Sequence, residues 1–213
     1  AISMDGVTVF FGLHGHLRAD AARIYWEAFG GKLGRVLGPE RQALAFFERV
    51  MRQDHCFTAV AADGALVGLA GFKTAIGSFA GGGWSDLRAV YGNWGGRWRA
   101  AALWLLNHEA DSDRFLIDGL CVARSHRSQG IGTLLLTALF AEATARGYSA
   151  IRLDVVDENW RARALYARHG FITTRTENLG LLRHLFGFKA STTMVQPLPQ
   201  SPQPVKLRPN PGG

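Results

Sequence analysis

The sequence predicts an α/β protein of the α+β type, with a mixed, mostly antiparallel sheet flanked by helices. Strand-like and helix-like segments alternate along the 213 residues. Two strands within residues 56–75 are joined through Asp63-Gly64, a hairpin turn dipeptide that makes them antiparallel. Hydrophobic residues make up 47% of the chain, which is enough to build a core and excludes a largely disordered protein.

The first half of the chain contains a strand, two helices and the hairpin. Residues 7–13 (VTVFFGL) predict the strand, and residues 18–33 predict a helix that ends near Gly30-Gly31, a typical C-cap. Residues 39–53 predict a second helix, because Pro39 suits a first helical turn and the apolar residues recur with the helical period.

Residues 77–112 form a glycine- and tryptophan-rich insertion after the hairpin. Two helix-like pieces, SDLRAVY and RWRAAALWLLNH, are separated by GNWGG, and the insertion holds Trp84, Trp94, Trp98 and Trp104. The aromatic rings suit a lid over an apolar or cationic ligand, or alternatively a satellite core or a dimer contact. The apolar stretch AAALWLL could pack in a homodimer or against its own domain.

The second half continues the alternation of strands and helices. The predicted strands are 115–123, 150–156, 171–176 and 190–198, and the predicted helices are 130–147 and 159–170. We expect a single domain over residues 4–196, with Met4 as the natural start. Six of the seven prolines lie in residues 197–213, so we expect an extended tail outside the core.

Charge and composition narrow the function classes. The net charge of +7 favours anionic partners such as a phosphorylated cofactor, nucleic acid or a membrane surface. No apolar run approaches the roughly 20 residues that span a bilayer, and no signal peptide pattern is present, so a cytoplasmic location is expected. Cys56 and Cys121 predict buried thiols in a reducing compartment. His14 and His16 are the only close histidine pair, so no metal site is predicted.

The segment RSQGIG (127–132) lies between a predicted strand and a predicted helix. The first amides of a helix lack internal partners and carry partial positive charge, and Gly130 and Gly132 leave the backbone accessible. This arrangement suits phosphate groups, to which Arg127 would add a charge. The spacing fits neither a Walker loop nor a dinucleotide fingerprint, and a tight turn without a ligand is the alternative.

A second motif follows about thirty residues later. Together the two motifs resemble those of the GCN5-related N-acetyltransferase (GNAT) superfamily. The first matches Arg/Gln-x-x-Gly-x-Gly/Ala, and the second matches Asn-x-x-Ala-x-x-Leu-Tyr-x-x-x-Gly-Phe without a gap. The matching residues of the second motif are Asn159, Ala162, Leu165, Tyr166, Gly170 and Phe171. The resemblance is close over residues 115–172.

The resemblance implies a GNAT-like fold and acetyl-CoA as the acetyl donor, with CoA as product. Pantetheine would lie in a splay between parallel strands 115–122 and 150–156. The pyrophosphate would lie on the glycine turn. The residues expected to bind the cofactor are Leu120, Cys121 and Val122 on the strand, Arg127, Ser128, Gln129, Gly130, Ile131, Gly132 and Thr133 at the turn, and Asn159, Ala162 and Tyr166 beyond.

The chemistry of acetyl transfer assigns roles to two side chains. Tyr166 would lie near the sulfur and could protonate the departing thiolate, although a packing role is the alternative. Asp118 lies two residues before Leu120, so we expect both on one face of the strand, where the carboxylate could act as general base. Asp118 could equally bind the substrate ammonium or cap a neighbouring element, with water chains accepting the proton.

The sequence therefore predicts an N-acetyltransferase that acts on a primary amine of a small molecule or peptide. Two alternatives stay open. One is an RNA-directed enzyme that acetylates aminoacyl-tRNA, which the net charge of +7 motivates although nucleic acid is not the favoured partner. The other is a module that binds acetyl-CoA without turnover, against which an intact Tyr166 argues.

Overall fold

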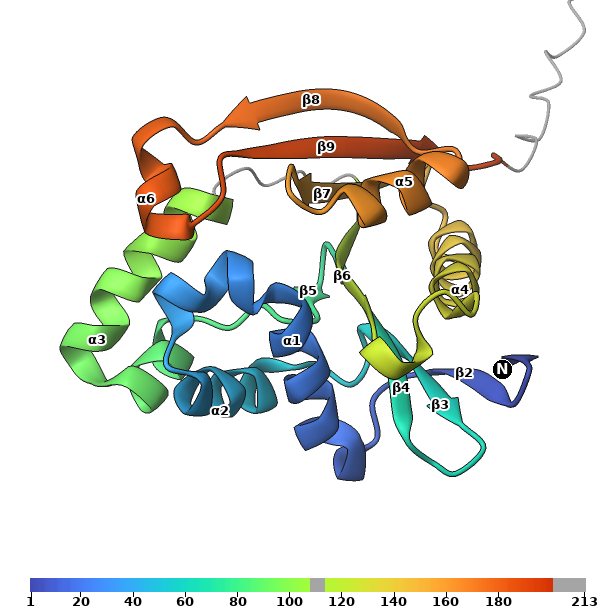
Figure 1. Ribbon diagram of the computed structural model, residues 1–213, viewed down its shortest axis with the longest axis horizontal. Coiled ribbons are helices and arrows are strands. Elements are labelled where there is room, and N and C mark those ends of the chain that lie inside the picture. The colour runs from blue at the N-terminus through green and yellow to red at the C-terminus, as the bar shows by residue number, and fades with distance from the viewer. Residues whose placement is uncertain (108–113, 201–213) are drawn as a thin grey trace, which may run out of the picture.

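The computed structural model describes residues 1–107 and 114–200, which form a nine-stranded mixed sheet (Figure 1). The strand order is β1-β2-β3-β4-β6-β7-β9-β8, and the short β5 pairs with β4. The strands are β1 (Ile2–Met4), β2 (Val7–Phe11), β3 (Cys56–Ala61), β4 (Leu66–Thr74), β5 (Gly77–Ser78), β6 (Phe115–Val122), β7 (Ala150–Val156), β8 (Ile172–Asn178) and β9 (Ala190–Pro197). The α-helices are α1 (Arg18–Leu37), α2 (Glu40–Val50), α3 (Trp84–Asn107), α4 (Ile131–Ala145), α5 (Trp160–Arg168) and α6 (Arg183–Phe186).

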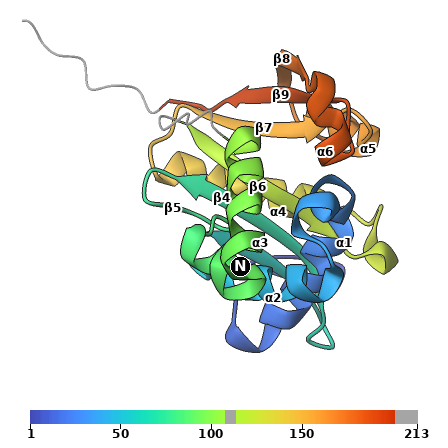
Figure 2. The same ribbon diagram turned by 90° about the vertical axis from the view of Figure 1, so that its left-hand side faces the viewer.

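Helices cover both faces of the sheet (Figures 1 and 2). On one face α4 and α5 pack in the larger core, where Leu135 and Tyr166 share a cluster with Ile151 of β7. On the other face α1 and α2 form a second core that contains Tyr25 and Phe47, whose rings meet edge to face at 5.0 Å. The strands in the middle of the sheet are therefore buried on both sides, which fixes the faces to which their side chains point.

The predicted fold class is confirmed. β6 and β7 run parallel, and every other strand pairing among the described residues is antiparallel. The predicted hairpin joins β3 to β4, and Gly64 in its turn has a φ of 85°, a conformation that glycine adopts without strain.

The end predicted for the first helix near Gly30-Gly31 is wrong, because α1 continues to Leu37. A Cβ on Gly30 would lie 3.2 Å from the indole of Trp26, so this glycine makes room for a ring one turn earlier. The helix ends before Gly38-Pro39, where the residue preceding a proline is disfavoured in helical geometry. Gly38 is extended, with φ −64° and ψ 168°.

The insertion forms two helical segments that meet at a kink at Gly92, the first residue of GNWGG, so the two predicted pieces are confirmed and the break between them is shorter than predicted. Within α3 only Gly92, with a φ of 76°, departs from helical geometry. The helix docks on the C-terminal end of α1, where the hydroxyl of Tyr91 donates to the carbonyl of Leu37 and Arg99 Nε donates to that of Val36 at 2.7 Å. The described part of the insertion is therefore packed on the body of the fold.

The tryptophans of the insertion do not fill a satellite core. Trp94 is 83% exposed, and Trp84, Trp98 and Trp104 are exposed as well. The side chains that α3 buries are smaller, such as Leu87 and Ala102. The expectation that aromatic rings pack the insertion against its own domain is therefore wrong for these four rings.

The sheet extends beyond the expected domain bounds of residues 4–196 at both ends, and β9 ends within the predicted strand 190–198. β1 begins at Ile2, before the expected start at Met4, and pairs with β2. At the other end Pro197 pairs with Ala150, and the buried Leu198 donates its amide to the carbonyl of Ser149 at 2.8 Å. Residues 201–213, the rest of the proline-rich tail, lie outside the described residues.

Two expectations concern the cysteines and membrane-spanning segments. Cys56 and Cys121 are buried free thiols, as predicted, and burial raises the pKa of each to about 12. Within residues 1–107 and 114–200, none of the helices has the length and apolar character that crossing a membrane requires.

Candidate active site

The parallel strands β6 and β7 separate soon after they begin. They pair only at Phe115 with Ile151 and at Leu116 with Arg152. β6 stays paired with β4 as far as Val122, and β7 stays paired with β9 along its whole length. Beyond Leu116 and Arg152, each strand therefore has one edge without a strand partner. Backbone groups on such edges are open to an extended ligand.

Two predicted cofactor residues, Leu120 and Val122, turn their backbone groups toward this gap. The amide of Ala123 donates to the carbonyl of Val67 in β4 at 2.8 Å. Because backbone directions alternate along a strand, Val122 and Leu120 face the opposite edge. Cys121, predicted with them, does not face the gap. Its backbone is directed to β4, and its buried thiol donates to the carbonyl of Leu69.

The glycine turn presents a row of amides without helical partners. A short 3-10 turn, η2 (Arg124–His126), follows β6, and Gly130 is the N-cap of α4 with a φ of 83°. No described backbone carbonyl accepts a hydrogen bond from the amides of residues 128–133. This segment consists of Ser128, Gln129, Gly130, Ile131, Gly132 and Thr133. The positive end of the α4 dipole coincides with these amides, so the turn suits an anion.

The side chains around the turn hold it in shape. Arg127 Nε donates to the Val122 carbonyl at 3.1 Å, so the guanidinium closes the turn onto β6. Thr133 Oγ1 lies 3.2 Å from His169 Nε2 and links α4 to the end of α5. A Cβ on Gly132 would lie 3.2 Å from Leu165, so this glycine allows α4 and α5 to approach each other.

The second motif builds α5 beside the gap. Asn159 is the N-cap of the helix, and its Oδ1 accepts from the amide of Ala162 at 3.3 Å. The exposed amide of Asn159 has two further N–H donors on its nitrogen, which a carbonyl of a bound cofactor could accept.

Tyr166 lies inside the core on the inner side of α5. It is 6% exposed, and its ring meets Phe171 edge to face at 5.6 Å. Burial raises the pKa of Tyr166 far above its usual value, and Cys121 on β6 adds to the shift. The hydroxyl therefore keeps its proton at neutral pH and lies within electrostatic reach of β6, so it is able to donate a hydrogen bond.

The expectation that Asp118 and Leu120 share a face is wrong, because a β-bulge lies between them. Gly71 of β4 pairs with Gly119, while the next residue, Phe72, pairs with Ile117, so Asp118 is the extra residue. Leu120 packs against the core under α4.

The Asp118 carboxylate belongs to the opposite side of the sheet. Its Oδ2 accepts from Ser78 Oγ at 2.7 Å and from the amide of Ala80 at 3.0 Å. Its carbonyl accepts from the hydroxyl of Tyr25 at 3.1 Å. Asp118 thus ties the start of the insertion and α1 to the bulge, which is the capping alternative of the sequence analysis.

A sequence model of the acetyltransferase (GNAT) family matches residues 19–171, well over half of the chain. The chain belongs to the GNAT family. The match begins in α1 and ends at Phe171, so it contains the splayed strands, the glycine turn and α5. Acetyl-CoA is the donor that this family uses, and the domain is an acetyltransferase domain.

A curated relative shares part of its sequence with this chain, and several solved structures share its fold. The "Probable N-acetyltransferase camello" of Xenopus tropicalis is 35% identical over 74 residues, and the match spans 34% of that protein's length and 35% of this chain. The Escherichia coli ribosomal-protein-S18-alanine N-acetyltransferase has a TM-score of 0.58 at 16% identity, covering 94% of this chain and 99% of that one.

Two further structures share the GNAT fold. An agmatine N-acetyltransferase has a TM-score of 0.61 at 15% identity, covering 91% of this chain and 100% of its own. The yncA protein of Salmonella typhimurium, solved with acetyl-CoA, has a TM-score of 0.56 at 16% identity, covering 95% and 100%. At these identities the likeness demonstrates the fold.

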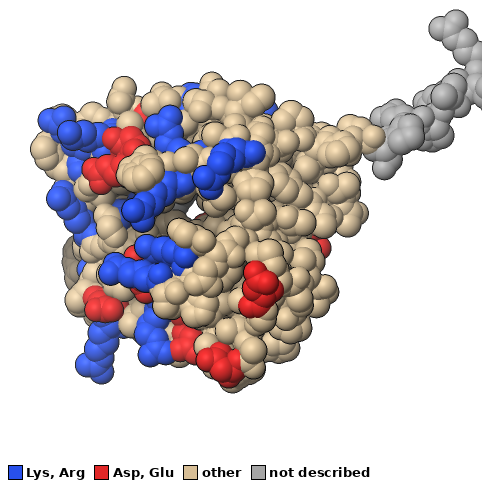
Figure 3. Space-filling view, turned by 45° about the vertical axis from the view of Figure 1, so that its right-hand side comes forward, with Lys and Arg blue, Asp and Glu red and all other residues tan. Residues whose placement is uncertain are grey.

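The residues of this GNAT domain fit a CoA thioester. CoA combines a charged pyrophosphate with an extended arm that contains amides. The unpartnered amides of residues 128–133 suit the pyrophosphate, and the open edge at Leu120 and Val122 suits the arm. Figure 3 shows Lys and Arg side chains around a hollow near the middle of the face that it draws, which favours an anionic ligand there.

Proposed function

We propose that this chain transfers the acetyl group of acetyl-CoA to a primary amine of a small molecule or peptide by direct attack of the amine on the thioester. One observation supports this function above the others. The parallel strands β6 and β7 splay apart, a turn of unpartnered amides follows β6, and the helix α5 that carries the buried Tyr166 follows β7. Such an arrangement serves both to bind an anionic thioester and to donate to its leaving group.

The proposed reaction forms a C–N bond and breaks the C–S bond. The neutral amine attacks the thioester carbonyl carbon, and the oxyanion that develops accepts from a backbone N–H on the open edge of β6. When the tetrahedral species collapses, the sulfur leaves and takes a proton from Tyr166, which gives CoA as the thiol. Burial disfavours the phenolate, so Tyr166 regains a proton released from the acetylated nitrogen.

The amine proton leaves to water or to Asp118. Both hydrogen bonds to the Asp118 carboxylate reach one oxygen, Oδ2, so Oδ1 is the oxygen that could accept a proton. The contacts with Ser78 and Ala80 support a positioning role for Asp118 in addition, because they fix the segment that leads from β5 into α3.

Measurements of RNA binding, cofactor binding and CoA release would distinguish two other functions. An RNA-directed activity toward aminoacyl-tRNA rests on the net charge of +7, and RNA affinity would then fall steeply as salt increases. A module that binds acetyl-CoA without turnover would show a cofactor-dependent rise in melting temperature and no CoA release with any amine. A cytoplasmic location is proposed because the free thiols Cys56 and Cys121 suit a reducing compartment.

The test is CoA release from acetyl-CoA in the presence of small amines and short peptides, measured with a thiol reagent. We expect release that depends on the amine and that increases with pH as the acceptor nitrogen loses its proton. No release with any amine, from protein that binds acetyl-CoA, would leave only the binding module.

A further inference from the structure

The second segment of α3, residues 93–107, turns an apolar side to solvent at the outer edge of the molecule (Figures 1 and 2). Six exposed residues on this side form the indole face: Trp94, Arg97, Trp98, Ala101, Trp104 and Leu105. Residues three, four, seven and eleven positions apart return to the same side of a helix, so these side chains share one sector. The opposite side carries Arg99 and Ala102, which dock α3 on the body of the fold.

A pocket lies between the indole face and the first segment of α3. Its volume is about 290 Å³, and its lining consists of Trp84, Asn93, Trp94 and Arg97. A Cβ on Gly96 would lie 3.0 Å from the ring of Trp84, so this glycine lets the indole of the first segment rest on the second. The kink at Gly92 thus brings two indoles, a guanidinium and a carboxamide together.

The polar groups of the pocket suit a phosphate ester. The exposed Arg97 side chain forms no hydrogen bond or ion pair with any residue that the structure describes. Its fork of N–H donors matches the oxygens of a phosphate, and the carboxamide of Asn93 adds two more donors. An indole combines an apolar ring with one N–H, so it favours the boundary between water and hydrocarbon. A phospholipid headgroup presents both features, a phosphate above the start of an acyl chain.

Charge on and beside α3 favours an anionic surface. The only acidic residue of α3 is Asp86, and its carboxylate is paired with Arg49 of α2 at 2.8 Å. The neighbouring α6 carries Arg183 and His184 and no acidic residue. The whole chain has a net charge of +7. A negatively charged surface is therefore attracted to this end of the molecule.

Two other partners fit the indole face less well. A second copy in a symmetric contact would place Arg97 against the same face, which holds no acidic side chain to pair with it. A nucleic acid is bound through a row of cations along its phosphates, whereas the indole face has one arginine among five apolar residues. An anionic bilayer requires fewer cations, because burial of apolar side chains supplies the rest of the affinity.

We propose that the indole face of α3 binds the surface of an anionic phospholipid bilayer, with a headgroup phosphate in the pocket at Arg97 and Asn93. The contact is peripheral, because one side of α3 is apolar and the other is docked on the fold, so the helix lies along the surface. The inference is independent of acetyl transfer. It adds a membrane surface as the place where the acetyltransferase domain is held.

The first experiment measures sedimentation of the full chain with vesicles of phosphatidylcholine alone, or of phosphatidylcholine and phosphatidylglycerol in equal amounts. We expect the partition coefficient to be about tenfold or more higher on the anionic vesicles and to fall as salt screens the charges. Arg97→Ala should lower it about fivefold through the loss of one charge. Trp94→Ala should lower it by about the same factor or more through the loss of apolar burial.

The matched controls are Trp160→Ala and Arg168→Ala, which remove the same types of exposed side chain from α5. Helix α5 lies away from α3 (Figures 1 and 2), so both controls should bind the anionic vesicles within about twofold of the parent. The melting temperatures of Trp94→Ala and Arg97→Ala should match that of the parent, which separates a lost contact from a lost fold.

Tryptophan fluorescence provides a second measurement. The emission should shift to shorter wavelength on anionic vesicles as the indoles leave water, and the shift should be smaller in Trp94→Ala than in Trp160→Ala. Equal binding by all four variants would identify an unspecific attraction of charge and would overturn the inference, as would no binding at low salt.

Two further results would assign the indole face to another partner and overturn the inference. One is a dimer that Trp94→Ala dissociates, without binding to vesicles. The other is binding of single-stranded RNA through Trp94, again without binding to vesicles. CoA release from acetyl-CoA is measured in the absence of vesicles, so each of these results leaves the proposed function unchanged.

Discussion

At the scale of single residues, Tyr166 is the side chain on which the proposed chemical step depends. Replacing Tyr166 with Phe keeps the ring against Phe171 and removes only the hydroxyl. Because that hydroxyl is proposed to protonate the leaving sulfur, turnover should fall by roughly a hundredfold or more, with the affinity for CoA nearly unchanged. Steady-state CoA release and calorimetric CoA binding measure the two quantities.

Tyr148→Phe is the matched control for Tyr166→Phe. Tyr148 packs against the same core, and its ring contacts Phe115 at the paired start of β6, away from the open part of the gap. We expect its loss to change turnover less than twofold, which is about 0.4 kcal/mol in activation free energy. Equal activity of Tyr166→Phe and the parent would remove the tyrosine from the mechanism.

Asp118 permits a test that separates proton transfer from positioning. Because two donors already hold Oδ2, we expect Asp118→Asn to lower kcat/KM roughly tenfold at every pH from neutral to alkaline. Ser78→Ala removes one of those donors and leaves the carboxylate, so it should reproduce part of the loss. A loss confined to low pH, which disappears as the acceptor amine loses its own proton, would identify Asp118 as the general base.

At the scale of elements, α3 combines a buried docking face with exposed indoles. Arg99 donates to the carbonyls of Val36 and Gly38 at the end of α1, and its guanidinium lies 4.0 Å from the Tyr91 ring centroid. A cation there offsets the negative end of the α1 dipole. Trp94, on the exposed side, has no comparable role in the fold.

We expect replacement of Arg99 to lower the free energy of unfolding much more than replacement of Trp94. Arg99→Ala should lower the free energy of unfolding by about 1.5–3 kcal/mol, because it removes charged hydrogen bonds. Trp94→Ala should change it by less than about 0.5 kcal/mol. Denaturant unfolding measures both values, and sedimentation measures the oligomeric state. A Trp94→Ala variant that converts a dimer to a monomer would assign the exposed indoles to a contact between two copies.

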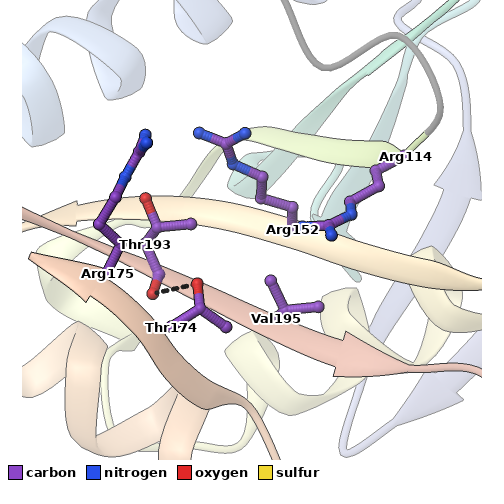
Figure 4. Close-up of a pocket in the computed structure, with 6 residues that line it drawn as sticks. All are labelled: Arg114, Arg152, Thr174, Arg175, Thr193 and Val195. Atoms are coloured by element: carbon purple, nitrogen blue, oxygen red, sulfur yellow. Dashed lines mark hydrogen bonds between the residues drawn. The ribbon is translucent and has the colours of Figure 1, made fainter. Parts of the chain in front are cut away.

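At the scale of the whole molecule, the sequence predicted features that depend on neighbouring residues better than features that depend on contacts between distant segments. The glycine turn and the cap of α5 follow from residues a few positions apart, so Gly130 and Asn159 are found where the sequence places them. The bulge at Asp118 arises from pairing with β4, about fifty residues earlier, and no local pattern contains it. A pocket lined by Arg114, Arg152 and Arg175 joins residues of β7, β8 and β9 with the residue just before β6 (Figure 4), so alternation in any one strand indicates only that a residue is on a face.

The prediction that the first helix ends near Gly30-Gly31 was wrong for a related reason. A glycine after an apolar helix is typical of a C-cap, but here it accommodates Trp26 from the preceding turn. The sequence shows that a small residue stands at position 30. Only the packed structure shows which neighbour requires a small residue there.

The sheet as a whole is joined across the gap by only two residue pairs between β6 and β7. A cofactor that contacts the turn at the end of β6 and Asn159 after β7 would bridge the two halves. We therefore expect CoA to stabilise the fold, by about 2.7 kcal/mol when its free concentration is a hundredfold above the dissociation constant. Thermal melting with and without CoA measures the effect, and amide exchange should slow at residues 128–133.

Two glycines at opposite ends of α4 provide the decisive comparison. Gly130 and Gly147 have φ values of 83° and 80°, so a leucine at either position introduces similar backbone strain and should lower the melting temperature of the free protein. Only Gly130→Leu places a side chain at the proposed pyrophosphate site. Gly147→Leu should keep the full CoA-dependent rise in melting temperature, and Gly130→Leu should lose most of it. If both variants keep that rise, CoA does not bind at the glycine turn; if the parent protein shows none, the cofactor site itself is wrong.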